Sequence, residues 1–362
     1  MDKAALVWPK PTKNSFNNMM EQSDIRNNCI NLFRLIAALE VVYTHAISHL
    51  QLTKLAGIDE AIRFFNGVPM FLTLSGFLIW FSVERSHSYK DYLKKRFWRI
   101  FPELWLAVLV EIVVILLLYK EPVDYAKLGL FTITQGTVFQ FWTPNCLRGY
   151  GCGTPNCALW TICVLIQFYV VAFIIHKWLK NGRLYLWMVV IAITVLIGAL
   201  SPYLLDRITL YSVNLGRILA ITIFPYLWMF IIPAFVADKI EVILPVLKRC
   251  WWVIMLIALF SYILHVDIST GTNVYGIIGL VESVFLFLTI IAIGYKFPQL
   301  TIKKDISYGI YIYHVTIINA LRVLGYTGNY WLLLLTIVAT CLLAWLSTVT
   351  IGSFSSLKRK KY

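Results

Sequence analysis

The sequence predicts an all-α, polytopic membrane helical bundle of about ten transmembrane helices, with both termini in the cytoplasm. The composition is 59% hydrophobic and only 14% charged, whereas about a quarter of the residues in a soluble domain are charged. The apolar residues occur in runs of about twenty, the length at which a helix crosses ~30 Å of hydrocarbon. Because lipid offers no partners to backbone polar groups, such runs are expected to be helical.

The apolar runs follow one another along nearly the whole chain and predict a single membrane domain at 29–353, between a cytoplasmic tail at 1–28 and a basic cytoplasmic tail at 354–362. The first run is too long for a signal peptide and is expected to stay in the protein. The interrupted stretch 125–141 is expected to be re-entrant or interfacial. Spans are predicted near 30–50, 64–82, 101–119, 158–176, 185–203, 215–236, 251–267, 274–294, 306–324 and 330–352.

The distribution of Lys and Arg predicts the orientation of the chain. Most of the 32 basic residues fall in alternate segments, namely the N-terminal tail, 83–100, 177–184, 237–249, 295–305 and the C-terminal tail. The positive-inside rule places these segments in the cytoplasm of a multi-pass protein of the cell inner (plasma) membrane. Anionic lipid head groups of the bilayer then account for the net charge of +14, and no nucleic-acid partner is expected.

Three cysteines, Cys146, Cys152 and Cys157, fall in a short segment on the expected outer side. An oxidising compartment would allow two of them to form a disulfide, and Cys163 is a further candidate partner. A zinc site is the alternative, which is disfavoured because only three thiols are present and no histidine lies close in sequence.

Ionisable residues occur where lipid normally excludes them. Arg34 and His45 lie in the first span, eleven residues apart, so they project within ~20° of one helix face and about 16 Å apart. Charge inside a span indicates function by default. The alternative is that Arg34 reaches the inner interface and His45 forms a hydrogen bond within the bundle.

Two further arginines, Arg96 and Arg99, are three residues apart on the inner side and are neighbours if the segment is helical. Arginine forks suit phosphate groups. The alternative is an ordinary cluster of inner basic residues.

Five motifs occur together and in a fixed order: NLFRLIAALEVVYTH, MFLTLSGFLIW, KKRFWRIFPELW, NCALWTICVLIQFYVV and SYGIYIYHVTI. In these motifs the sequence resembles the acyltransferase-3 family of integral membrane O-acyltransferases, from about residue 28 to 352. The resemblance implies about ten core spans. It also implies transfer of an acyl group, usually acetyl from acetyl-CoA, to hydroxyls of a polysaccharide or lipid-linked glycan of the cell envelope, such as O-antigen, capsule or exopolysaccharide.

The resemblance also implies roles for residues that match its motifs. His45 is the expected catalytic general base and Arg34 its partner, while Arg96, Arg99, Ser75 and Gly76 are expected to bind acyl-CoA. A second group is expected to line the site: Asn156, Trp160, Ser307, Tyr311 and His314. The last three are spaced to share one helix face, and a polar stripe that packs helices is the alternative.

One departure from the family concerns a carboxylate. The family usually places a glutamate five residues after the tryptophan, where this chain has Leu165. Glu40 is a candidate replacement and site-lining acid, although it lies ~140° around the helix from His45, so a packing role is equally open. Glu103, after Pro102, is expected to begin a helix.

Two alternatives to a standard enzyme follow from the same residues. The missing glutamate leaves open a catalytically altered member of the family that acts as a glycan transporter or sensor. His45 and His49 share a face at i and i+4, but no further ligands are evident and no metal is expected.

Overall fold

The computed structural model describes residues 27–53, 57–180, 182–268 and 277–360, and these are helical with no strand among them. The all-α prediction is therefore confirmed. The predicted tail 1–28 lies almost entirely outside this part of the chain. The helices are α2 (Ile30–His49), α3 (Ile58–Arg63), α4 (Gly67–Glu84), α5 (Tyr89–Leu118), α6 (Tyr125–Gln135), α7 (Trp160–Leu179), α8 (Leu184–Tyr211), α9 (Val213–Ala220), α10 (Trp228–Asp238), α11 (Ile240–Ile268), α12 (Ile277–Lys296), α13 (Ser307–Val323), α14 (Trp331–Ser347) and α15 (Ser353–Lys360).

Eight helical stretches in the described chain are long and apolar enough to cross a membrane, which confirms a multi-pass membrane protein. The count of ten and the side of the termini stay predictions. Helix α13 has 17 residues, and the span predicted at 215–236 is divided between α9 and α10, which has 11 residues. The division falls at Pro225, which lies in a short 3-10 turn and cannot donate a backbone hydrogen bond.

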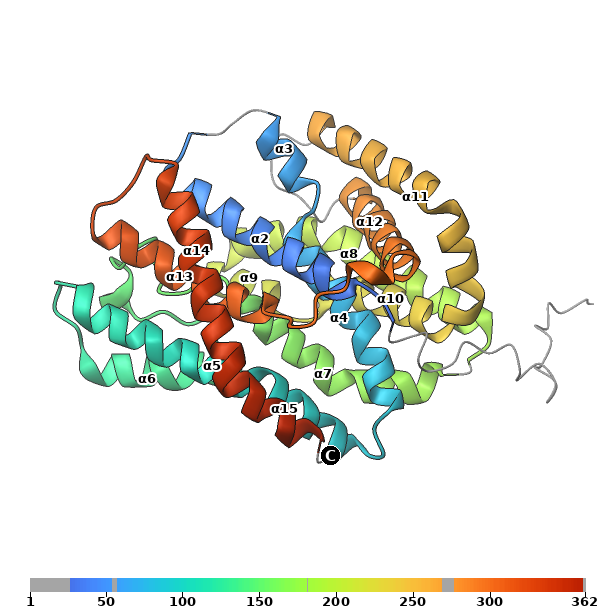
Figure 1. The fold of residues 1–362 in the computed structure, drawn as a ribbon, viewed down its shortest axis with the longest axis horizontal. Helices are drawn as coiled ribbons and strands as arrows, with labels where there is room; N and C mark the ends of the chain where they lie inside the picture. The colour runs from blue at the N-terminus through green and yellow to red at the C-terminus, as the bar shows by residue number, and fades with distance from the viewer. Residues whose placement is uncertain (1–26, 54–56, 181, 269–276, 361–362) are drawn as a thin grey trace, which may run out of the picture.

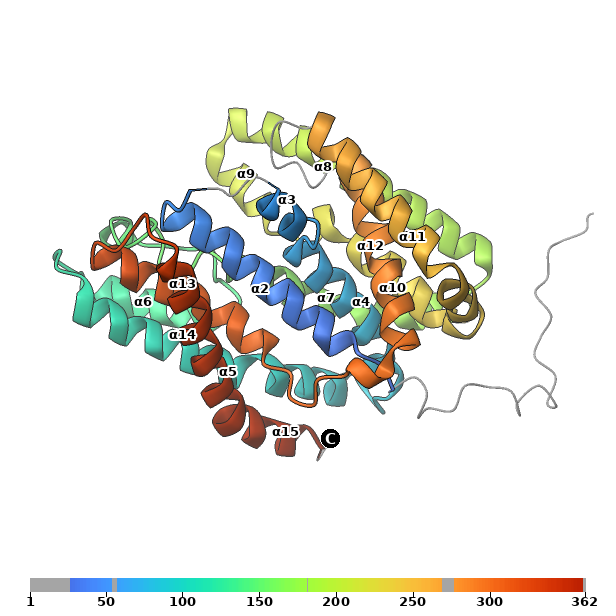
Figure 2. The ribbon, with the colours of Figure 1, turned by 45° about the horizontal axis from the view of Figure 1, so that its top comes forward.

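The helices at the centre of the bundle are those that carry the predicted site. Figures 1 and 2 show α2 crossing the middle, with α13 and α14 on one side and α4, α10 and α12 on the other. Helix α13 is buried along most of its length. In each of the long helices α8 and α11, by contrast, only 22% of the apolar stretch is buried inside the protein, as expected of helices that face lipid.

Helix α5 differs from its prediction in a way that matters for the site. It begins at Tyr89, where the Ser88 side chain accepts a hydrogen bond from the backbone of Asp91 at 3.2 Å, and runs for 30 residues through Pro102. Glu103 is therefore buried in mid-helix, and the prediction that it begins a helix was wrong. The arginines of this segment consequently lie on a helix continuous with the span.

Two shorter helices pack against α5. Helix α6 covers part of the stretch predicted to be re-entrant or interfacial, and Trp105 donates to the carbonyl of Gly136 at 2.8 Å. Its 11 residues are too few to span a bilayer. The predicted C-terminal tail continues α14 through a π-turn into α15, where Phe354 meets Trp98 edge-on at 5.9 Å.

Candidate functional site

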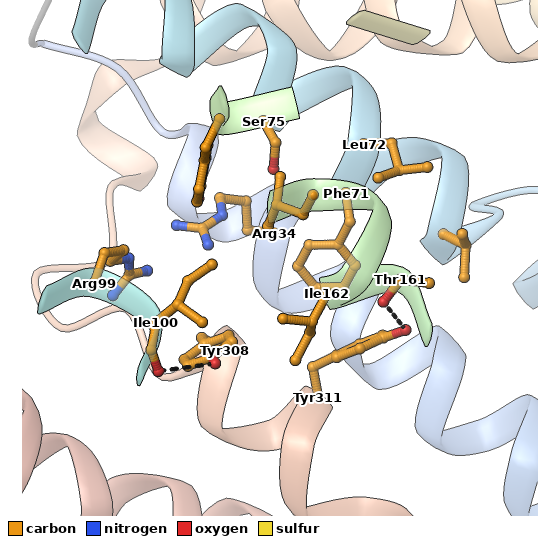
Figure 3. A pocket seen from close by; sticks show the side chains of 13 residues that line it. Arg34, Phe71, Leu72, Ser75, Arg99, Ile100, Thr161, Ile162, Tyr308 and Tyr311 are labelled. Atoms are coloured by element: carbon orange, nitrogen blue, oxygen red, sulfur yellow. Dashed lines mark hydrogen bonds between the residues drawn. The ribbon is translucent and has the colours of Figure 1, made fainter. Parts of the chain in front are cut away.

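A cavity of about 70 Å³ lies among α2, α4, α5, α7 and α13. This volume has room for a few water molecules. Figure 3 shows the guanidinium groups of Arg34 and Arg99 approaching each other at one end. Ser75 from α4 and Tyr311 from α13 also line the cavity. Four of the predicted site residues, from four different helices, thus surround one space.

The two arginines share one carboxylate, that of Asp305, two residues before α13. Arg34 Nη1 donates to Asp305 Oδ2, and Arg99 Nη2 donates to the same oxygen at 3.1 Å. The other oxygen accepts hydrogen bonds from the backbone and the hydroxyl of Ser307. The group of two guanidiniums and one carboxylate keeps a net positive charge.

Burial raises the pKa of the Asp305 carboxyl, but Arg34, Arg99 and the hydrogen bonds from Ser307 lower it further, to about 2. The carboxylate is therefore ionised at physiological pH. The sequence alone does not single out this residue, because it follows two lysines in a segment interpreted only as basic. Its position just before the first turn of α13 was the available signal.

Arg96 approaches the same region through different partners. Its Nη2 donates to the Ser82 hydroxyl at 2.7 Å, and its guanidinium lies 5.5 Å from the centre of the Tyr169 ring, which lines the cavity. The predicted pair Arg96 and Arg99 is thus divided, with one member paired to Asp305 and the other stacked at the edge of the cavity.

His45 contacts a second histidine, His314 of α13. His45 Nδ1 lies 2.8 Å from His314 Nε2, and the rings stack with centroids 5.0 Å apart. His314 Nδ1 lies 2.7 Å from the carbonyl oxygen of Tyr311. A carbonyl only accepts, so His314 carries its proton on Nδ1 and its Nε2 accepts from His45. This assignment leaves His45 Nε2 with a free lone pair, which a general base requires.

One face of α13 connects the two ends of the site. Ser307 contacts Asp305 at the arginine end, and Tyr311 lines the cavity and shares a hydrogen bond of 2.7 Å with Thr161. The ring of His314 lies 5.9 Å from that of Tyr311 and stacks on His45. Arg34 contacts Asp305, two residues before α13, and His45 contacts α13 itself, in agreement with the face predicted for α2.

Three other predicted site residues pack or position the elements around the cavity. A Cβ on Gly76 would lie 3.0 Å from Phe230 Cα, so this glycine lets α4 approach α10 closely. Buried Asn156 donates to the carbonyl of Ile312 at 2.9 Å and joins the segment before α7 to α13. Trp160 begins α7.

Glu40 serves to hold two helices together. Its carboxylate accepts from the backbone of Gly67 at 2.8 Å and from the Thr44 hydroxyl at 2.8 Å, so it caps the start of α4. These contacts fit the packing role, and the suggestion that Glu40 replaces the missing family glutamate stays a prediction. Leu165 does line the cavity. Asp305 holds a carboxylate against two arginines that line the cavity, Arg34 and Arg99.

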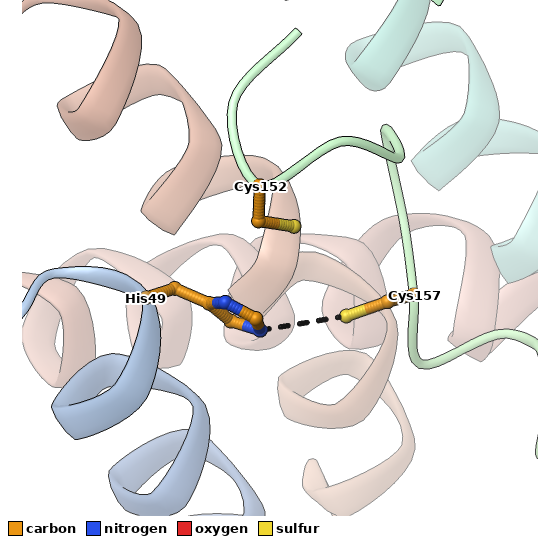
Figure 4. Close-up of side chains that lie close together, drawn as sticks. All are labelled: His49, Cys152 and Cys157. Carbon is orange, nitrogen blue, oxygen red and sulfur yellow. Dashed lines mark hydrogen bonds between the residues drawn. The ribbon is translucent and has the colours of Figure 1, made fainter. Parts of the chain in front are cut away.

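A separate cluster lies at the other end of α2 (Figure 4). The donor atoms of His49, Cys152 and Cys157 lie within 4.8 Å of one another. His49 Nε2 is 3.8 Å from Cys157 Sγ. The histidine that the sequence did not show near these thiols thus comes from the first span. This removes one of the two reasons for disfavouring a metal site.

Known proteins match nearly the whole chain in sequence. A family model described as an acyltransferase domain, of the acyltransferase-3 type, matches residues 27–350. Nodulation protein 10 of Rhizobium leguminosarum bv. viciae is 28% identical over 355 residues, which cover 90% of this chain and 92% of that protein.

Two further relatives are matched over shorter regions. The O-acetyl transferase of Shigella phage Sf6 is 28% identical over 199 residues, 52% of this chain and 57% of that protein. Peptidoglycan O-acetyltransferase OatA of Listeria monocytogenes serovar 1/2a (strain ATCC BAA-679 / EGD-e) is 26% identical over 140 residues, 35% of this chain and 22% of that protein. No solved structure matches the chain.

Proposed function

The chain belongs to the acyltransferase-3 family and is a membrane O-acyltransferase, and from this premise we propose that it transfers acetyl from cytoplasmic acetyl-CoA to a hydroxyl of a cell-envelope polysaccharide. The observation that carries the proposal is the path along α13, from two guanidinium groups at Asp305 to the pair of His45 and His314. Two guanidinium groups that could bind an anion lie at one end of this path, and a histidine that could act as a base lies at the other.

The donor end would bind the phosphates of CoA. Arg34 and Arg99 present two guanidinium forks against a single carboxylate, and such forks bind phosphate oxygens through charge-assisted hydrogen bonds. A CoA phosphate would take over the hydrogen bonds that Asp305 accepts. The cavity of about 70 Å³ is too small for a nucleotide, so the phosphates would stay at the arginine end and the thioester arm would extend toward Tyr311.

His45 would act as the general base. The acceptor hydroxyl gives its proton to His45 Nε2 while its oxygen forms the ester bond to the thioester carbonyl carbon. The carbon–sulfur bond breaks, and His45 returns the proton to the CoA sulfur. His314 would hold the imidazole in the required tautomer through the 2.8 Å contact, as an orienting group does for a catalytic histidine.

The proposed orientation of the protein in the membrane rests on the distribution of basic residues. Lys303 and Lys304 precede Asp305, and Lys94 and Lys95 precede the arginines of α5, so basic residues gather at the donor end. Placing this end in the cytoplasm of an inner-membrane protein brings it to acetyl-CoA. The opposite end, with His49, would then face the glycan. The names of two relatives, an O-acetyl transferase and a peptidoglycan O-acetyltransferase, support acetyl transfer to a glycan.

Mass spectrometry of envelope glycans tests this function. Cells that express the wild-type chain should carry acetyl esters that are lost with His45→Ala and kept with His87→Ala, an exposed histidine outside the site. Both variants must reach the membrane in equal amounts. Unchanged glycan acetylation with His45→Ala would contradict the role of His45, and glycan movement without consumption of acetyl-CoA would indicate a transporter.

A further inference from the structure

The cluster of His49, Cys152 and Cys157 is not used by the proposed reaction, and its geometry points to a ligand. The three donor atoms come from two separate parts of the chain, the last turn of α2 and the segment before α7 (Figure 4). A disulfide would need only the two sulfurs. The convergence of an imidazole nitrogen on both thiols is typical of a metal site with mixed nitrogen and sulfur ligands.

The distances fit a tetrahedral ion. Zn–S bonds of ~2.3 Å and Zn–N bonds of ~2.0 Å place the donor atoms of one zinc about 3.5 to 3.8 Å apart. The separation of His49 Nε2 and Cys157 Sγ is 3.8 Å, and the whole set lies within 4.8 Å. Cys152 and Cys157 are separated by four residues, within the usual spacing of zinc-binding cysteine pairs. Small side-chain rotations would complete the three-ligand set.

The segment that carries the cysteines is held in place without any ion. Asn319 of α13 accepts from the backbone of Cys152 at 2.9 Å and donates to the carbonyls of Thr154 and Pro155 at 3.0 and 2.7 Å. Gly151 precedes this turn with φ of +53°, and a Cβ there would lie 2.2 Å from Asn319 Oδ1. The turn is therefore built around the Asn319 amide. In this turn both thiols lie on the side that faces His49 (Figure 4).

Helix α13 also contacts the end of α2 that carries His49. Arg322, one turn after Asn319 on α13, donates to the backbone carbonyl of His49 at 2.7 Å. The Leu50 carbonyl also accepts from the backbone of Gly328 at 2.9 Å. Helix α13 thus fixes the end of α2 and the cysteine segment relative to each other, and the ligands are largely preorganised.

The ligand types select the ion. Thiolate sulfur and imidazole nitrogen favour Zn²⁺ over the hard cations Mg²⁺ and Ca²⁺, which prefer oxygen. Two thiolates and a neutral imidazole also give a divalent ion an uncharged site, which suits the partly buried position of both cysteines. With three protein ligands, the fourth position of a tetrahedral ion stays open to water.

We infer that His49, Cys152 and Cys157 bind one Zn²⁺ ion, which fastens the segment before α7 to the end of α2. The ring of His49 lies 5.5 Å from that of His45, so the ion sits one helical turn from the proposed base. Binding of the ion does not depend on the proposed acyl transfer. If that function holds, the ion also orders one wall of the route by which the acceptor reaches His45, and this second role rests on the proposed function.

Metal analysis of the full-length protein, purified in detergent from zinc-supplied cells, tests the site. The wild-type chain should hold about one zinc per chain, and His49→Ala, Cys152→Ser and Cys157→Ser should each lose at least nine-tenths of it. Cys146→Ser, a matched change in the same segment, and His45→Ala should keep it. Replacement of zinc by Co²⁺ should give a thiolate charge-transfer band and the d–d bands of a tetrahedral ion.

A second measurement needs no variant and covers the case in which a variant fails to fold. Alkylation of the wild-type protein, followed by peptide mass spectrometry, should label Cys152 and Cys157 much faster after a strong chelator than before it. The rate at Cys146 should not change. Zinc that survives all three substitutions would overturn the inference, as would a Cys152–Cys157 disulfide in protein alkylated directly in native membranes. Loss of zinc in His45→Ala would show that the metal binds elsewhere.

Discussion

The Nδ1 atom of His45 lies 2.8 Å from the Nε2 atom of His314, although 269 residues separate the two in the sequence. The contact joins α2 to α13 at the end of the path opposite the arginines. Because His314 Nδ1 faces a backbone carbonyl, the direction of the hydrogen bonds leaves the remaining nitrogen of His45 free to accept a proton.

His314→Ala should lower kcat about 10- to 100-fold, because His45 loses the partner that sets its tautomer and ring orientation. KM for acetyl-CoA should change little, since His314 lies away from the arginine end. His314→Gln offers a side-chain oxygen that can accept from His45 and should restore part of kcat. Steady-state kinetics in detergent measure both constants. An alanine variant with wild-type kcat would exclude the orienting role.

Arg99→Lys should raise KM for acetyl-CoA about tenfold and leave kcat nearly unchanged. Lysine keeps the charge but loses the planar fork that contacts phosphate oxygens, and one charge-assisted hydrogen bond is worth about 1.5–3 kcal/mol. Arg183→Lys, at an exposed arginine outside the cavity, is the control. Equal effects of the two substitutions on KM would show that Arg99 does not contact the donor.

Asp305→Asn should lower the stability of the folded protein by about 3–5 kcal/mol, because it leaves two partly buried guanidiniums without their counter-charge. Thermal unfolding in detergent measures the change. Added CoA should raise the Tm of the variant more than that of the wild type, because the CoA phosphates replace the missing anion. Asp124→Asn, which removes an exposed ion pair with Lys127, should leave Tm unchanged. No loss of Tm in Asp305→Asn would contradict the three-residue ion cluster.

The pH dependence of stability should carry the signature of Asp305. Its folded-state pKa of about 2 lies below the value of about 3.9 in an unfolded chain. A depressed carboxyl pKa stabilises the folded state above the unfolded-state value and loses that contribution as pH falls toward the folded-state value. The difference in Tm between wild type and Asp305→Asn should therefore be constant down to about pH 4.5 and shrink below it. A constant difference across that range would argue against the assignment.

Local patterns predicted the fold class and part of the site, and long-range contacts account for what they missed. The spacing of Arg34 and His45 predicted one face of α2. In the structure Arg34 contacts Asp305, two residues before α13, and His45 contacts His314 of α13. Periodicity likewise placed Ser307, Tyr311 and His314 on one face. These inferences succeed because a helix determines the relative directions of its own side chains.

The misses concern partners that are distant in the chain. Asp305 pairs with Arg34 over 271 residues, and His49 meets Cys157 over 108, so no sequence window holds both members. The divided span at 215–236 was missed because its apolar content outweighed the signal of Pro225. Glu103 was misplaced because the polar start of α5 did not look like part of a span.

The central claim is tested most directly by the rate of acetyl transfer by the purified protein reconstituted in vesicles. Acetyl-CoA with a radiolabelled acetyl group is supplied inside the vesicles, and the protein is oriented with its donor end toward the lumen. The wild-type chain should move label onto an acceptor glycan and release CoA, and a folded His45→Gln variant should do neither while still binding CoA at the arginine end. Transfer by that variant at the wild-type rate would contradict the role of His45 as the base.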